Sequence, residues 1–474
     1  MLNFKKEEIK EKVYFTSNIG SFFIVLIFLL LAWLPFFLEY FPGTLTFDSI
    51  IEIYQILGEQ KLTNYNPIIH VGFLAFSLAI GNLFGSISAG VAVNTILQFI
   101  IVASICSFSI YYLAKKKVDI RIRISCLIIY SFLPTIPIMN VIIHKDTIFS
   151  AFMILLIIVY YELISNFKNL FKHKLRIIFG IIIIVITSLS RRNALYVLYA
   201  TVLFFSLYVF VNKNYFKGYV IKIICFLLIS LVLAYSSNRI VLNYTKVEDS
   251  WKKYIPAQYN FMVQQLLRIA IDHKEEMKND ELKLVNGLFG NTKKTSIENC
   301  YTPYLVDTAM QEGDSVFFKK HKSELVNLYF RLILKYPISF IDSVFCTTSG
   351  YWDIEETRFS LWTNMRPNNF GVETNPILEN YYAKFMYNLM YYQNIPLIGL
   401  LYSASLPFWI ILGLIVFNLY NKKIDIIIVF IPLILYFGTM FVGPLNGENR
   451  YVFCFWMCLP LLIALTLHKM GTNE

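Results

Sequence analysis

Long apolar runs separated by short polar segments dominate both ends of this sequence. The runs cover residues 20–38, 68–85, 89–113, 124–143, 147–164, 177–190, 194–211, 223–237, 397–419, 424–442 and 450–467. A helix needs about 20 predominantly apolar residues to cross the hydrocarbon core of a bilayer. The runs are continuously apolar and do not alternate, which argues against membrane-spanning β-strands. The pattern therefore predicts an all-α polytopic protein anchored in the lipid bilayer.

Composition supports the membrane assignment and removes several classes of function. Hydrophobic residues make up 57% of the 474 residues and charged residues only 15%, with a mean hydropathy of +0.57. Soluble domains carry about 25% charged residues, so a soluble enzyme, a nucleic-acid-binding protein and a disordered scaffold are excluded. Most cysteines lie inside apolar runs, where they act as small hydrophobic side chains. Cys300 and Cys346 lie in the central polar stretch, and whether they pair stays open.

The distribution of basic residues predicts the topology. If all eleven runs crossed the membrane from a cytoplasmic N-terminus, the basic segment 115–123 would lie outside, against the positive-inside rule. Run 68–85 is the weakest, because His70 and several glycines interrupt it, so we expect a surface or re-entrant helix that lies along or dips into the outer face without crossing. About ten crossings then remain, with 19 basic residues in cytoplasmic segments and 5 in short outer segments. Both termini are expected in the cytoplasm of a cell-membrane protein.

This topology divides the chain into three parts. Residues 1–237 form an N-terminal transmembrane module with the candidate site, and residues 396–474 form C-terminal transmembrane helices. Between them, 238–395 is expected as a mainly helical extracytoplasmic domain, with helical patterning near 258–283 and 315–345. That stretch holds 18 basic and 18 acidic residues, so the net charge of +11 comes from the segments flanking the membrane. Such a pattern orients the chain and argues against a nucleic-acid partner.

Polar residues that are unusual in a membrane protein gather in the predicted outer loops. Asp48 and Glu52 are four residues apart and share a helix face, with Gln55 following at helical spacing. Two adjacent arginines between apolar runs are costly unless they meet an anion or line a wet cavity. The candidate site residues from these loops are Asp48, Glu52, Gln55, His70, Lys145, Asp146, Arg191, Arg192, Arg450 and Tyr451.

Simpler interpretations of several candidates stay open. Asp48 follows a Pro-Gly pair and could serve as a helix N-cap or an Asx-turn residue. Lys145 and Asp146 could be an interfacial pair in which the lysine snorkels, and His70 could simply lie at the interface. Arg191, Arg192 and Arg450 could likewise be interfacial anchors.

Carboxylates and cations at the outer leaflet suit a transferase whose donor is a sugar linked to a lipid phosphate. A carboxylate base would deprotonate the acceptor hydroxyl, while cations would hold the phosphate and stabilise it as leaving group. Such an enzyme needs no nucleotide-binding loop, because its donor arrives in the bilayer.

The order of these motifs resembles the GT-C superfamily of polyprenyl-phosphate-sugar glycosyltransferases. The resemblance rests on Pro42-Gly43, Asp48, Asn66-Pro67, His70, Lys145-Asp146, Arg192-Asn193 and Arg450-Tyr451, and it is closest to an uncharacterised GT-C-like family of bacterial envelope proteins. It implies a multi-pass helical fold, a polyprenyl-phosphate-sugar donor and an extracytoplasmic glycan, lipid or protein acceptor, in envelope polysaccharide or glycan assembly. It also implies that Asp48 and Asp146 are the catalytic acids and that Arg191 or Arg192 approaches the lipid phosphate.

Three questions remain open at this point. Asp48 stands alone, without a neighbouring second acid, so a divalent metal such as Mg²⁺ or Mn²⁺ is possible but not required. An oligosaccharide polymerase or ligase would share the many spans and arginines. A lipid-linked glycan transporter or flippase would place charged residues midway through its spans.

Overall fold

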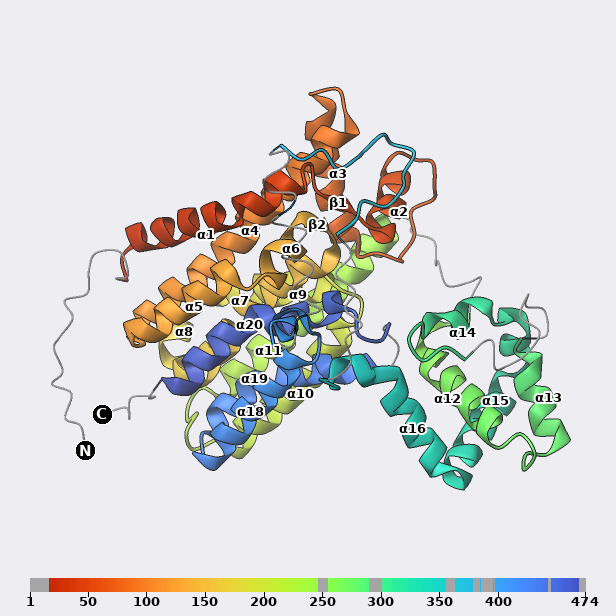
Figure 1. Ribbon diagram of the computed structural model, residues 1–474. Coiled ribbons are helices and arrows are strands. Elements are labelled where there is room, and N and C mark those ends of the chain that lie inside the picture. The colour runs from red at the N-terminus through yellow and green to blue at the C-terminus, as the bar shows by residue number, and fades with distance from the viewer. Residues whose placement is uncertain are drawn as a thin grey trace.

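The computed structural model describes residues 17–245, 255–289, 301–354, 363–377, 384, 395, 397–441 and 445–468. Within them the protein is almost entirely helical, with a compact helical bundle and a smaller helical domain beside it (Figure 1). The bundle contains α1 (Ile19–Glu39), α2 (Phe47–Ile56), α3 (Ile68–Asn82), α4 (Ile87–Lys115), α5 (Ile120–Phe132), α6 (Thr135–Val141), α7 (Lys145–Ser165), α8 (Phe167–Lys172), α9 (Lys174–Leu189), α10 (Ala194–Val211), α11 (Val220–Tyr244), α18 (Leu406–Tyr420), α19 (Ile424–Gly438) and α20 (Asn449–Leu467).

The prediction of an all-α multi-pass membrane protein is confirmed. Seven helices in the described part of the chain are long and apolar enough to cross a membrane: α1, α4, α7, α10, α11, α19 with its 3-10 extension to Phe441, and α20. The bent pair α5 and α6 would make an eighth span, with a 46° bend where Leu133 and Pro134 interrupt the helix. The remaining two expected crossings are α9 and α18, of 16 and 15 residues. At about 1.5 Å per residue they are shorter than the hydrocarbon core, so the count of ten stays a prediction.

One expected helix begins later than the apolar run that predicted it. Run 397–419 was expected to be helical throughout, but α18 starts at Leu406 with Pro407 in its first turn. The preceding residues form a short 3-10 helix, Gly399–Tyr402. Proline lacks a backbone N–H and is tolerated at a helix start, which explains why the regular helix begins here.

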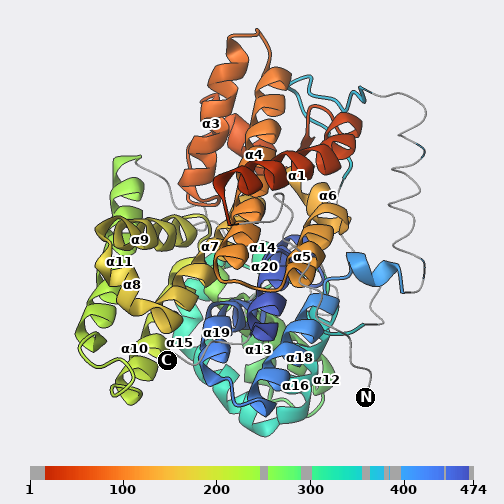
Figure 2. The ribbon, with the colours of Figure 1, turned by 90° about the vertical axis from the view of Figure 1, so that its left-hand side faces the viewer.

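Helix α3 packs beside the first half of α4, as a hairpin that Figure 2 shows from the side. The two backbones touch, because a Cβ on Gly81 would lie 2.2 Å from the nitrogen of Gly90. Glycine at both positions therefore allows the close approach. Whether α3 lies on the membrane surface stays a prediction.

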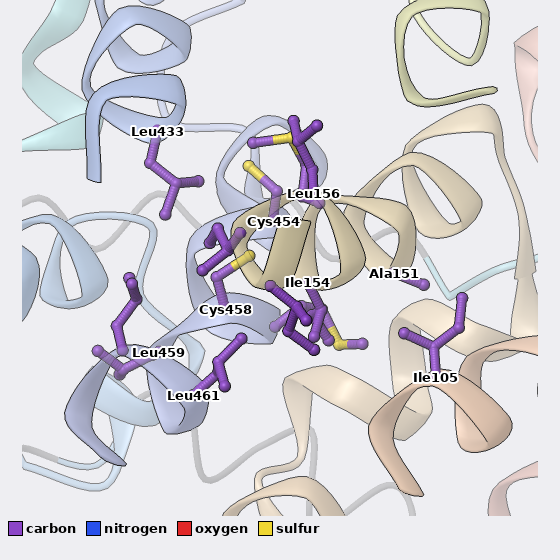
Figure 3. Packing of buried hydrophobic residues seen from close by; sticks show 14 of the residues in the cluster. Ile105, Ala151, Ile154, Leu156, Leu433, Cys454, Cys458, Leu459 and Leu461 are labelled. Atoms are coloured by element: carbon purple, nitrogen blue, oxygen red, sulfur yellow. The ribbon is translucent and has the colours of Figure 1, made fainter. Parts of the chain in front are cut away.

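The main core lies where α4, α7, α19 and α20 meet, and Figure 3 shows part of it. Cys454 and Cys458 of α20 are buried there among leucine and isoleucine side chains. This confirms the prediction that they act as small hydrophobic residues. Helices α7 and α20 are the most enclosed spans, each 78% buried. The residues that begin these two helices are thereby held rigidly at one end of the bundle.

The second domain has a core of its own. It comprises α12 (Asn260–Asp272), α13 (Asn279–Gly287), α14 (Asp307–Glu312), α15 (Ser315–Lys335) and α16 (Pro337–Thr348). The helical patterning expected near 258–283 and 315–345 is thus present. Cys300 lies outside the described residues, so its pairing with Cys346 is not described.

Candidate functional site

A two-residue parallel strand pair brings the first loop to the start of α7. Strand β1 (Thr44–Leu45) pairs with β2 (Ile142–Ile143), with Leu45 opposite Ile143. His144 directly follows β2, and Asp48 follows β1 after Thr46 and Phe47. Gly43 has a φ of +129°, and a Cβ there would lie 2.1 Å from Oγ1 of Thr95. Only glycine lets the chain enter β1 in this position.

Asp48 is buried in the first turn of α2 and lies among three cationic groups. Its Oδ2 lies 3.0 Å from Nε2 of His144 and accepts hydrogen bonds from Nζ of Lys145 at 2.9 Å and from Arg450 at 3.1 Å. Lys145 also donates to the side-chain oxygen of Asn66 at 2.5 Å. The expected pair of Lys145 with Asp146 is therefore not formed, because the lysine points to Asp48 instead.

His144 connects Asp48 to the second acid. Its Nδ1 lies 2.7 Å from Oδ2 of Asp146, so the imidazole is placed between two carboxylates. The other carboxylate oxygen of Asp146 forms an ion pair with Arg191. Asp146 is fully buried and Arg191 is 8% exposed.

Aromatic rings enclose the arginines of this network. The guanidinium of Arg191 lies 4.8 Å from the ring centroid of Tyr451 and donates a hydrogen bond to the hydroxyl of Tyr436. Arg450 donates to the hydroxyl of Tyr451 at 2.9 Å and forms an ion pair with Glu448. Rings beside a guanidinium provide cation–π stabilisation, so both arginines are held in place.

The pKa values of Asp48 and His144 are shifted in opposite directions. Burial raises the pKa of Asp48, but Lys145, His144 and Arg450 outweigh burial and hold it well below its usual range. Burial lowers the pKa of His144, but Asp146 and Asp48 outweigh burial and raise it above its ordinary value. Asp48 is thus an ionised carboxylate, and the two acids beside His144 favour the protonated imidazole, while Arg450, with Nη1 2.8 Å from Nε2 of His144, opposes it.

A cavity of about 340 Å³ opens beside Asp48, and we call it the Asp48 cavity. Its walls come from both domains: Asp48, Tyr65 and Arg450 from the bundle side, and Asp307 from α14 of the second domain. Burial raises the pKa of Asp307 to about 6, helped by Glu448 and Asp48 and opposed by Arg450. This cavity therefore contains one firmly ionised acid and one that titrates near neutrality.

A second cavity, of about 600 Å³, is lined in part by Arg191 and Asn66 of the same network, and we call it the Arg192 groove. It runs between the start of α3, the turn from α9 to α10, and the last turns of α11. Arg191, Arg192 and Arg239 lie in its wall together with apolar residues and the tyrosines of α10 and α11. Asn66 also lines it, and this residue bonds both Lys145 and the backbone oxygen of Asp48.

The structure therefore brings together most, but not all, of the candidate residues. Asp48, Lys145, Asp146, Arg191, Arg450 and Tyr451 form one connected cluster, and Arg192 lies next to it in the groove wall. Glu52, Gln55 and His70 make their contacts elsewhere. Glu52 pairs with Nδ1 of His70 at 2.9 Å, and Gln55 donates to Thr63 at 3.0 Å.

The N-cap interpretation of Asp48 is wrong. Thr46 is the N-cap of α2 and accepts from the backbone of Ser49. Asp48 lies in the first turn, where a carboxylate is favoured by the helix dipole, and its side chain is used for the cation contacts. The interfacial interpretation of His70 does not fit either, since its side chain is 5% exposed and paired.

Sequence reasoning missed Arg239 in the wall of the Arg192 groove and three residues around Asp48. His144 precedes two candidates directly, and a histidine at the start of a span next to an acid is a signal that would have identified it. Glu448 lies two residues before Arg450 and pairs with it. Asp307 carried no signal, because only tertiary structure brings the second domain over Asp48.

The carboxylates of this site do not fit a divalent metal. In the part of the chain that the structure describes, no group of three or more His, Cys, Asp and Glu residues is placed to hold one. Asp48 and Asp146 are each neutralised by lysine or arginine, which a metal would have to displace. The chemistry considered below therefore uses the side chains of the chain itself.

Comparison with known proteins identifies the family. The chain belongs to a family of unknown function (DUF6020), whose model matches residues 57–473. The match includes His144, Asp146 and Arg450, whereas Asp48 and Glu52 precede it. No curated protein and no solved structure matches the chain.

Proposed function

We propose that this protein is a membrane glycosyltransferase that moves a sugar from a polyprenyl-phosphate carrier to a hydroxyl group of an extracytoplasmic acceptor. The acceptor would be a glycan, lipid or protein of the cell envelope. The active site would be the cluster around Asp48, at the outer face of the membrane.

The observation that carries the proposal is that a cavity lined by the ionised Asp48 is linked, through Asn66, to a second cavity of different character. The Asp48 cavity is formed with the second domain, which suits a polar acceptor. The Arg192 groove is bordered by the transmembrane helices α10 and α11, which suits a lipid-linked donor. The cluster of Asp48, Lys145 and Asn66 lies between them.

The reaction follows from this placement. The acceptor hydroxyl attacks the anomeric carbon of the donor sugar, and the bond from that carbon to the phosphate oxygen breaks. The hydroxyl proton passes to the carboxylate of Asp48, and the polyprenyl phosphate leaves as an anion. General base catalysis typically contributes roughly 10²–10⁴-fold, and we expect the low end of this range here, because the cations that lower the pKa of Asp48 also make it a weaker base.

The cations divide into two roles. Arg192 and Arg239 in the groove wall would hold the phosphate of the donor, since arginine forks onto phosphate oxygens. Arg191 is a positioning residue, because it is buried and its guanidinium is engaged by Asp146 and Tyr436. The earlier expectation that either arginine could approach the phosphate thus narrows to Arg192.

Binding of a polyprenyl monophosphate to the purified protein tests the donor site without knowledge of the sugar. We expect Arg192→Gln and Arg239→Gln to weaken this binding roughly tenfold or more, since a hydrogen bond to a charged group contributes about 1.5–3 kcal/mol. Asp48→Asn should bind the same lipid normally but abolish sugar transfer from polyprenyl-phosphate hexoses in proteoliposomes.

The variants also separate this proposal from its rivals. A polymerase or ligase that depends on arginines would keep activity in Asp48→Asn. A flippase would move the lipid across the bilayer without forming a glycosidic bond. Unchanged lipid binding in both arginine variants would remove the Arg192 groove as the donor site.

A further inference from the structure

A third and larger cavity lies at the opposite end of the bundle from Asp48. It has a volume of about 870 Å³ and runs between α4, α7 and α9. Helix α7 begins at Lys145 in the Asp48 cluster and reaches this cavity at Glu162, near its other end. The two regions are thus separated by most of a helix of about 30 Å. We call this cavity the α4–α9 groove.

One part of the α4–α9 groove is apolar and reaches the surface of the bundle. Phe108 of α4 and Phe179 and Ile182 of α9 line it, and all three are exposed on the lipid-facing side of these spans. Ser104 lies deeper along α4. A hydrocarbon chain entering from the bilayer would meet only apolar or small side chains along this wall.

The other part of the groove carries a cluster of cations. Lys115 and Lys116 lie at the end of α4, and Arg176 lies in the first turn of α9. Glu162 is the only acidic residue that lines the groove in the described chain. The lining therefore has an excess of positive charge at one end.

The carboxylate of Glu162 already has partners within the protein. Glu162 pairs with Lys116, accepts from the hydroxyl of Tyr112 at 2.5 Å and accepts from Asn166 at 2.6 Å. Among the described residues, no carboxylate pairs with Lys115 or Arg176. Two cations at the mouth of an apolar groove are complementary to one kind of ligand, an anionic head attached to a hydrocarbon chain.

We propose that the α4–α9 groove binds an anionic phospholipid, whose phosphate contacts Lys115 and Arg176 and whose acyl chain lies along Phe108 and Ile182. Basic pockets between transmembrane helices recognise acidic lipid headgroups, and the volume is that of a ligand-sized cavity. Under the orientation predicted from the basic residues, this lipid belongs to the cytoplasmic leaflet. The proposal is independent of the glycosyltransferase reaction.

Native mass spectrometry of the full-length protein with phosphatidylglycerol or phosphatidylcholine tests the site. A juxtamembrane cation contributes about fivefold to the binding of an anionic lipid, so we expect Lys115→Gln with Arg176→Gln to weaken phosphatidylglycerol binding roughly thirtyfold. Phosphatidylcholine binding should not change. The matched control is Lys117→Gln with Lys172→Gln, which removes the same charge from the same end of the bundle but outside the groove.

A second variant tests the acyl chain. Ser104→Phe fills the apolar part and leaves both cations in place, so it should weaken phosphatidylglycerol binding, and inorganic phosphate should not compete. Equal losses in the cavity and control variants would mean general surface attraction and overturn the site. Competition by inorganic phosphate, with no effect of Ser104→Phe, would mean an anion site without a lipid and would also overturn it.

Discussion

The ion pair between Asp146 and Arg191 gives the sharpest prediction about the stability of the site. Asp146 is fully buried at the start of α7, and Arg191 reaches it from the turn between α9 and α10. Removing the arginine leaves a buried carboxylate that contacts His144 and has Lys145 as a further cation nearby. Breaking a buried pair in this way costs about 3–5 kcal/mol of unfolding free energy.

We therefore expect Arg191→Gln to lower the melting temperature in detergent by roughly 3–5 °C. The adjacent Arg192→Gln is the control, because Arg192 is exposed in the groove wall and its loss should cost no more than about 0.5 kcal/mol. The contrast between two neighbouring arginines separates the loss of a buried arginine from the loss of an exposed one with the same charge.

The decisive variant is the double replacement Asp146→Asn with Arg191→Gln. It removes both charges, so its loss of unfolding free energy should be smaller than the sum of the two single losses. The difference, which is the coupling energy of the pair, should be about 1–3 kcal/mol. Thermal unfolding of the four proteins completes this cycle. Additive losses would show that the pair does not stabilise the bundle. They would also contradict the positioning role of Arg191.

Three further predictions concern other parts of the structure. Gly43→Ala should destabilise the protein and abolish transfer, because the new Cβ would collide with Thr95 and the backbone φ is +129°. Thr95→Ala removes the collision but not the backbone strain, so it should restore thermal stability and activity only in part. Asp307 has a pKa raised to about 6, so its protonated form favours the folded state and stability is lost as pH rises from about 4 through 6. Asp307→Asn should match the wild-type melting temperature near pH 4 and exceed it above pH 6. A difference in melting temperature between the two proteins that does not change with pH would contradict this titration. Finally, externally added thiol reagent should label Asp280→Cys and not Lys117→Cys above the background of the parent protein, and the reverse pattern would invert the topology.

The helices could be predicted from the sequence because hydrophobic runs in a bilayer leave the chain few alternatives. Run 194–211 coincides with α10, and most other runs lie within a few residues of a helix. The exceptions have local causes. Pro134 breaks one run into α5 and α6, and Pro407 sets the start of α18.

The chemistry of the site was predictable only in part. Acids and cations at helix ends were visible, and their gathering at one end of the bundle follows from alternating helix directions. Which residues pair was not visible, because it depends on the register of two strands of two residues each. That register directs Lys145 to Asp48 and leaves Asp146 to Arg191. Glu52, one turn after Asp48 on α2, pairs with His70 of α3 instead of joining the cluster.

Charge balance in the cluster links the histidine to the proposed donor. Asp48, Asp146 and Glu448 are matched by three permanent cations, Lys145, Arg191 and Arg450. A phosphodiester arriving in the Arg192 groove would add a negative charge at the edge of a buried and otherwise neutral network. His144 carries the adjustable charge of this network: burial and Arg450, whose Nη1 lies 2.8 Å from Nε2 of His144, lower its pKa, but Asp146 and Asp48 outweigh them and raise it. Because the same imidazole contacts Asp48 and Asp146, it would hold the carboxylate of Asp48 ionised and oriented while the acceptor proton is transferred. His144 is thus the residue through which donor binding and acceptor activation would be coupled.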